Sequence, residues 1–217
     1  MKRFFISVFI SFFATLIIGA QSPEVVKAGN ILDKVSEIIQ SCQSIKADFT
    51  FTMENTQADI TDSHEGTILI AGDKYKASVM NVESYFDGKT LWTYLKEVDE
   101  VNISYPDPTD ETTLSPSNIF SIHKNGFRYI FAGEDVIDGQ KVNIVDLFPE
   151  DRNKPYSRIK VYVDEKTHYI KKIVQIGKDG NNYMIDINHM ETNIPYDADM
   201  FIFDPANHPD VEVIDMR

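Results

Sequence analysis

The stretch Ala47-Asp48-Phe49-Thr50-Phe51-Thr52-Met53 decides the fold class of this chain of 217 residues. Apolar side chains occupy every second position of the stretch, and polar ones lie between them. Successive side chains of a β-strand point to opposite faces, so this alternation predicts a strand with one apolar face. We therefore expect a protein built mainly on a β-sheet.

One amphipathic helix is predicted before this strand, over residues 23–42. Its apolar residues recur at helical spacing, namely Val25, Ala28, Ile31, Leu32, Val35, Ile38, Ile39 and Cys42. Ser22 followed by Pro23 is a favourable N-cap and first-turn pair. We expect this helix to lie across the apolar face of the sheet.

Strand patterns continue for the rest of the chain. They predict strands at 67–71, 74–80, 84–86, 90–95, 100–105, 127–131, 142–148, 156–164, 168–176, 183–190 and 199–204. Turn residues separate several of them, for example Gly72, Gly88 and the pair Asp138-Gly139. Sequential hairpins of this kind predict a strongly curved antiparallel sheet.

A loop and a second helical segment interrupt the strands. Residues 105–116 hold three of the nine prolines, which predicts a loop. Ser115-Pro116 then opens a short helical pattern through Ile119 and Phe120. An uncovered apolar sheet face is a liability in a soluble protein, so we expect helical segments to cover it.

The N-terminus has the features of a cleaved signal peptide. Lys2 and Arg3 precede an apolar run over 4–18, and Gly19-Ala20 provides small residues for cleavage before Gln21. The alternative is a membrane anchor, but about 15 apolar residues fall short of the roughly 20 that span a bilayer. We expect residues 1–20 to be removed and 21–217 to form a single domain, secreted to the periplasm. A lipoprotein would carry Cys in place of Gln21, so no lipidation is expected.

The composition argues against several classes of function. A net charge of −13 repels nucleic acid and anionic membranes. The single cysteine, Cys42, excludes an internal disulfide, and the five histidines do not have metal-ligand spacing. No known nucleophile or phosphate-binding motif is present. The sequence therefore predicts neither an enzyme nor a bound cofactor or metal.

Aromatic and apolar residues are abundant, with 14 Phe, 10 Tyr and 7 Met. These residues either build an ordinary core or also line a cavity for an acyl chain. Each buried methylene would contribute about 0.8 kcal/mol to binding without needing a polar partner.

The segment Asp87-Gly88-Lys89-Thr90-Leu91-Trp92-Thr93-Tyr94 resembles a stretch of the periplasmic outer-membrane lipoprotein carrier family, LolA. Three further segments agree in order with that family: the strand start at 44–50, the Gly66-led strand at 66–70 and the tail at 199–215. The resemblance spans the predicted mature chain.

This resemblance implies an unclosed β-barrel with a helical lid over a hydrophobic cavity. It implies a carrier that takes acylated lipoproteins from an inner-membrane lipoprotein-releasing ABC transporter and passes them to an outer-membrane acceptor. We expect this carrier to be a monomer. Inward-facing strand and lid positions would then bind lipid, and our candidates are Phe49, Phe51, Leu69, Tyr75, Trp92, Ile119, Phe120, Ile159 and Val161. A structural role for Trp92 at a hairpin end is the alternative.

One position departs from the family. Its better-known members place an Arg after the Gly-led strand, where it fixes the lid, whereas the turn here is Ala71-Gly72-Asp73-Lys74. Lys74 lacks the planar fork of donors that Arg offers. This departure leaves open a related module that binds another apolar ligand or senses the state of the envelope. An envelope hydrolase is a third hypothesis, against which the absence of a nucleophile motif argues.

Overall fold

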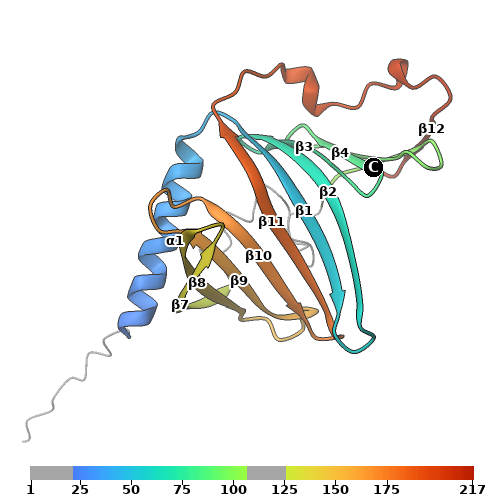
Figure 1. Ribbon diagram of the computed structural model, residues 1–217. Helices are drawn as coiled ribbons and strands as arrows, with labels where there is room; N and C mark the ends of the chain where they lie inside the picture. The colour runs from blue at the N-terminus through green and yellow to red at the C-terminus, as the bar shows by residue number, and fades with distance from the viewer. Residues whose placement is uncertain (1–21, 107–125) are drawn as a thin grey trace, which may run out of the picture.

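The computed structural model describes residues 22–106 and 126–217. The predicted signal peptide and the lid residues Ile119 and Phe120 lie outside these ranges. Within them the chain forms one α-helix, α1 (Pro23–Ser41), two short 3-10 helices and a sheet of twelve strands (Figure 1).

The first half of the sheet precedes the undescribed segment 107–125. Its strands are β1 (Ile45–Asn55), β2 (Ile60–Ala71), β3 (Lys74–Val79), β4 (Val82–Phe86), β5 (Leu91–Leu95) and β6 (Glu100–Ser104). The second half comprises β7 (Phe127–Ile137), β8 (Gln140–Pro149), β9 (Tyr156–Asp164), β10 (Ile170–Gly177), β11 (Asn181–Thr192) and β12 (Glu212–Asp215).

The strand order is β12-β6-β5-β4-β3-β2-β1-β11-β10-β9-β8-β7. Neighbouring strands are antiparallel except β12, which pairs parallel with β6. The two halves of the chain join where β1 pairs with β11. The strands β12 and β7 are the two ends of this order, so the sheet is not closed. Figure 1 shows that the sheet is curved. This is the unclosed β-barrel that the resemblance implied.

The start of α1 follows the sequence prediction. The side chain of Ser22 accepts a hydrogen bond from the backbone N–H of Val25 at 3.4 Å, and Pro23 occupies the first turn. The apolar stripe of the helix then packs on β7 to β10. The buried cluster that results contains Ala28, Ile31, Leu32, Val35, Val145, Leu147, Tyr156, Ile159, Val161, Val163, Ile170 and Ile173.

The C-terminal part differs from the prediction. Residues 199–204 were expected to form a strand, but Ala198–Phe201 is a short 3-10 helix, η2, and a second one, η3, spans Pro205–Asn207. The last strand is β12, further along the chain. Phe201 and Phe203 are nevertheless buried, because this segment folds back on the sheet.

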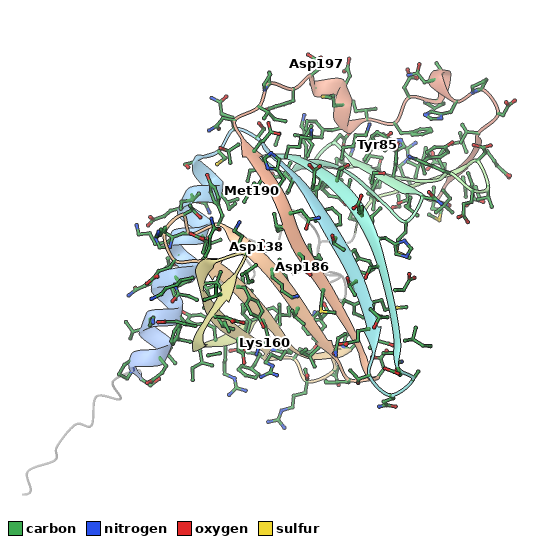
Figure 2. All side chains as sticks on the ribbon, viewed as in Figure 1. Tyr85, Asp138, Lys160, Asp186, Met190 and Asp197 are labelled. Carbon is green, nitrogen blue, oxygen red and sulfur yellow. The ribbon has the colours of Figure 1, made fainter. Side chains whose placement is uncertain are left out.

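The C-terminal segment builds a second apolar cluster near β3 to β6. Phe203 joins Tyr85, Tyr94 and Val101, and Trp92 and Val211 pack against them. The ring of Phe203 lies 5.2 Å from that of Tyr94 and 5.7 Å from that of Tyr85. Figure 2 shows Tyr85 close to the C-terminal segment, at the end of the sheet far from α1.

Candidate functional site

The strand register shows which side chains share the face that α1 covers. Directly paired residues of neighbouring strands point to the same face of a sheet. One row of paired residues runs from β8 to β1, and its members are Val145, Val161, Ile173, Ile185 and Phe51. Since Val145, Val161 and Ile173 belong to the cluster under α1, the whole row lies on one face. We call it the α1 face and its opposite the reverse face.

The candidates of the sequence analysis separate between these two faces. Phe49, Phe51, Ile159 and Val161 lie on the α1 face, and the register places Tyr75 there through its partner Ile70. The two lid candidates, Ile119 and Phe120, fall outside the described residues.

Leu69 and Trp92 lie on the reverse face, which corrects the expectation that all strand candidates share one side. Leu69 pairs with Lys46 and Lys76, and Trp92 pairs with Tyr85. A shift of one residue moves a side chain to the opposite face, so a misjudged parity reverses the assignment. Trp92 instead packs against the C-terminal cluster, where its role is structural.

The burial of the side chains on the α1 face decreases along the sheet, away from the helix. Under the helix these side chains are closely buried, as in Val161 with 4% exposure and Ile159 with 1%. On β1 and β2, Ile45, Ala47, Phe49 and Ile70 are buried on this face, but other apolar side chains of β11, β1 and β2 are only partly buried. They include Phe51, Met53, Ile68, Tyr183, Ile185 and Ile187. The β11 members Tyr183, Ile185 and Ile187 were not among the sequence candidates, although they alternate with other residues in the strand predicted at 183–190.

Aromatic contacts and a close approach define the geometry of this region. The rings of Phe51 and Tyr183 stack with centroids 6.2 Å apart. Those of Tyr75 and Phe86 lie 5.4 Å apart, and burial raises the pKa of the Tyr75 hydroxyl. Phe49 lies over Gly66, its partner on β2. The result is a continuous apolar surface that begins under α1 and extends past it onto partly exposed strands.

The described residues offer little for other chemistry. Within 22–106 and 126–217, no group of three or more His, Cys, Asp or Glu side chains is arranged to hold a metal ion. No helix in these ranges is long and apolar enough to cross a membrane. The partly buried apolar side chains of the α1 face suit contact with an apolar ligand, and the His64–Asp62 pair lies beside them on β2, 2.9 Å apart.

The fold is thus an open β-barrel with one helix packed on one end of its apolar sheet face. Residues 18–178 match the family described as outer membrane lipoprotein carrier protein LolA, which is most of the chain. The protein belongs to this family.

Several solved structures are similar to this chain at low sequence identity. An uncharacterized conserved protein from Thermus thermophilus has the same fold, with 11% identity and a TM-score of 0.60 over 87% of this chain and 99% of that chain. A LolA superfamily protein from Nitrosomonas europaea is 13% identical with a TM-score of 0.44, over 81% and 97%. LprF from Mycobacterium bovis is 15% identical with a TM-score of 0.45, over 81% and 97%. No curated protein matches the chain.

Proposed function

We propose that this protein is a periplasmic carrier that binds the acyl chains of lipoproteins on its α1 face and moves lipoproteins from the inner to the outer membrane. The observation that supports the proposal is the partly exposed apolar surface on β11, β1 and β2, which includes Phe51, Ile68 and Ile185. An alkyl chain that covers this surface removes it from water, at about 25 cal/mol per Å² of apolar area. The family description, lipoprotein carrier, agrees with this use.

The proposal includes the partners and location that go with such a carrier. The lipoproteins would be received from an inner-membrane lipoprotein-releasing ABC transporter and delivered to an outer-membrane acceptor. Residues 1–20 would act as a cleaved signal peptide, and the carrier would work as a monomer without catalysis. The net charge of −13 supports a partner that is neither nucleic acid nor an anionic membrane surface.

The lipid contacts would come from Phe49, Phe51, Tyr75, Ile159 and Val161 among the sequence candidates. Ile159 and Val161 are already buried under α1, so they would form the closed end of the site. Phe51, together with Ile185 and Ile187 on β11, would form its open part. Leu69 and Trp92 have no place in this site because they lie on the reverse face.

Native mass spectrometry of the protein isolated from its own periplasm tests the proposal. We expect a complex with an acylated lipoprotein, and we expect Ile185→Glu to lose it because the charge enters the apolar surface. Met184→Glu is the matched control, since Met184 is the neighbouring residue on β11 and lies on the reverse face. Equal cargo on both variants would contradict binding at the α1 face.

A second candidate is a carrier-fold module that binds a free lipid or senses the state of the envelope. The observation that favours it is the β2–β3 turn, where Gly72 and Asp73 stand and no Arg is available to fix a lid. Recovery of a free lipid in the same measurement, without lipoprotein, would favour this candidate.

A further inference from the structure

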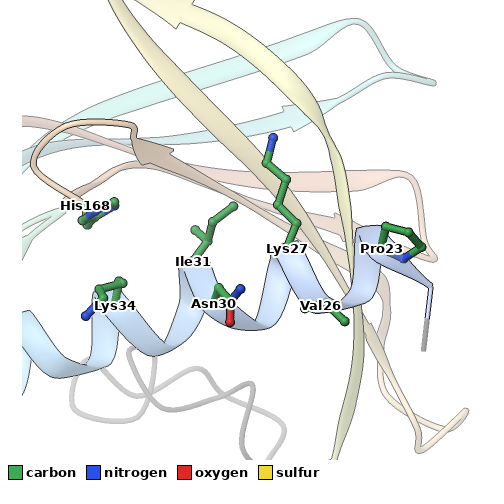
Figure 3. Close-up of a pocket in the computed structure, with 7 residues that line it drawn as sticks. All are labelled: Pro23, Val26, Lys27, Asn30, Ile31, Lys34 and His168. Carbon is green, nitrogen blue, oxygen red and sulfur yellow. The ribbon is translucent and has the colours of Figure 1, made fainter. Parts of the chain in front are cut away.

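A groove of about 580 Å³ follows one flank of α1 (Figure 3). Four of its lining residues, Pro23, Lys27, Asn30 and Lys34, recur at helical spacing and so form one stripe along the helix. Val26 and Ile31 line it beside the stripe, and His168 reaches it from the turn between β9 and β10. The volume falls within the range of about 300–1,000 Å³ that is typical of small-molecule sites.

The side chains that line the groove differ in charge from the protein as a whole. Among the described residues its polar lining consists of Lys27, Asn30, Lys34 and His168, and the carboxylates of Glu134 and Glu37 lie beside it as partners of the two lysines. The chain as a whole has 34 acidic residues against 21 basic ones. A site lined by ammonium, amide and imidazole groups suits an anion, while Pro23, Val26 and Ile31 suit an alkyl chain.

The two ammonium groups are positioned by contacts around the groove. Lys27 lies 3.2 Å from the Glu134 carboxylate and 3.5 Å from the centroid of the Phe131 ring. Lys34 lies 2.6 Å from the carboxylate of Glu37. Exposed ion pairs of this kind contribute only about 0–1 kcal/mol. A ligand anion can therefore share or replace these carboxylates at little cost.

His168 is held at the groove by a rigid turn. Its φ of +57° lies in the left-handed region, which is uncommon for a residue other than glycine. The Asp164 carboxylate accepts hydrogen bonds from the backbone N–H groups of Lys166 and Thr167 at 2.9 and 2.7 Å. The backbone N–H of His168 donates to the carbonyl oxygen of Asp164 at 3.0 Å. These contacts fix the turn and hence the position from which His168 reaches the groove.

We propose that this groove binds an anionic amphiphile with a single alkyl chain and a phosphate or carboxylate head group. The head group lies near Lys34 and His168 at one end of the groove, and the chain runs along Ile31 toward Lys27 and Val26. The site is separate from the apolar surface on β11, β1 and β2, so the inference does not depend on the carrier function. It gives the protein a second ligand, distinguished from the first by its charge.

Titrations followed by amide NMR shifts test the inference on the purified chain. The probes are dodecyl phosphate and dodecanoate below their aggregation concentrations, inorganic phosphate, and dodecyltrimethylammonium as the chain with a cationic head. We expect the two anionic amphiphiles to shift the amides of residues 23–34 and 165–169, and inorganic phosphate to bind far more weakly. The cationic amphiphile should leave these amides unchanged.

Variants separate this groove from the α1 face. An exposed lysine contact is worth up to about a fivefold change in affinity, so we expect the double variant Lys27→Ala/Lys34→Ala, which removes both ammonium groups of the groove, to weaken binding there about fivefold. Shifts at Ile185 on the α1 face should not change. Lys46→Ala/Lys89→Ala is the control, because it removes the same charge from β1 and the β4–β5 turn.

Three results would overturn the inference. These are equal binding of anionic and cationic amphiphiles at the groove, unchanged affinity in Lys27→Ala/Lys34→Ala, and inorganic phosphate binding as tightly as dodecyl phosphate. The last result would show a site for a free anion. A failure of the carrier proposal would appear instead at Ile185, with the shifts at residues 23–34 retained.

Discussion

Phe49 on β1 lies directly over Gly66 on β2, so closely that a Cβ atom at Gly66 would be 2.5 Å from the Cζ atom of Phe49. The two residues are register partners on the α1 face. Because Gly66 has no side chain, the Phe49 ring can lie over it at the centre of the sheet. The same hypothetical Cβ would approach the carbonyl oxygen of Ser78 on β3 to 2.9 Å, so three adjacent strands depend on this glycine.

Gly66→Ala should therefore destabilise the protein by about 1–3 kcal/mol, the usual cost of overpacking. Phe49→Leu in the same background should restore part of the loss, since the ring is one of the two groups that clash. Urea unfolding of the two single variants and the double variant measures the coupling. Additive losses in this cycle would show that the ring and the glycine do not interact.

The packing of the Phe203 ring on the reverse face gives a second prediction. Phe203 is 3% exposed and contacts the rings of Tyr85, Tyr94 and His208. Phe203→Ala should cost about 3–5 kcal/mol. It should also shift the fluorescence of Trp92, the only tryptophan, which packs against this cluster.

The control for the Phe203 substitution is the neighbouring Ile202, which is 42% exposed. Ile202→Ala should change the stability by no more than about 0.5 kcal/mol, as is usual for a surface substitution. If Phe203→Ala left both the stability and the tryptophan spectrum unchanged, the C-terminal segment would not be holding the sheet.

Much of the sheet could be predicted from alternation alone. The strand predicted at 156–164 matches β9, and the turns at Gly72 and at Asp138-Gly139 connect strands as expected. These elements were predictable because their signals are local. The β1–β11 pairing and the parallel β12 depend on contacts between distant parts of the chain, which no local pattern contains.

The errors have physical causes in particular residues. Phe201 and Phe203 alternate like a strand, but their alternation reflects burial against the sheet and not pairing with another strand. Leu69 stands between two isoleucines, Ile68 and Ile70, so three consecutive apolar residues hide the parity of β2. Trp92 follows Leu91, which lies on the α1 face, so an error of one residue in parity reverses its side of the sheet.

The buried carboxylate of Asp146 gives a third prediction. Its side chain is 7% exposed, and one oxygen accepts a hydrogen bond from Arg158 at 2.9 Å, with Lys160 at 3.7 Å from the other. Arg158→Ala should cost about 2 kcal/mol, because it leaves a buried carboxylate with only the more distant Lys160. Asp146→Leu/Arg158→Met should cost less than Arg158→Ala alone, since no charge is then left unpaired.

Thermal or urea unfolding of these variants at neutral pH provides the comparison. Lys178→Ala serves as a control for the removal of one exposed positive charge. A larger loss in the double apolar variant than in Arg158→Ala would mean that the ion pair itself stabilises the fold, and not merely that its rupture is costly.

The Asp164 turn gives a prediction about pH. Burial by itself raises the pKa of the Asp164 carboxyl, but the hydrogen bonds from Thr167 and Lys166 outweigh it and hold the pKa below its ordinary value of 3.8. The unfolded chain therefore takes up the proton first as the pH falls. The stability that this carboxylate contributes is fully present above pH 3.8 and is lost as the pH decreases below it, through the pKa of the folded state.

Asp164→Asn removes this titration while keeping the size and shape of the side chain. The variant should be less stable than the wild type by about 1 kcal/mol at neutral pH, because a neutral acceptor binds the turn amides less strongly. The difference should shrink as both proteins are taken from about pH 5 to about pH 3, since Asp164 of the wild type takes up its proton more readily in the unfolded chain than in the folded one. Urea unfolding at a series of pH values measures it. A difference that stayed constant over this range would mean that the charge on Asp164 does not hold the turn, and its support of His168 would then have to come from the backbone alone.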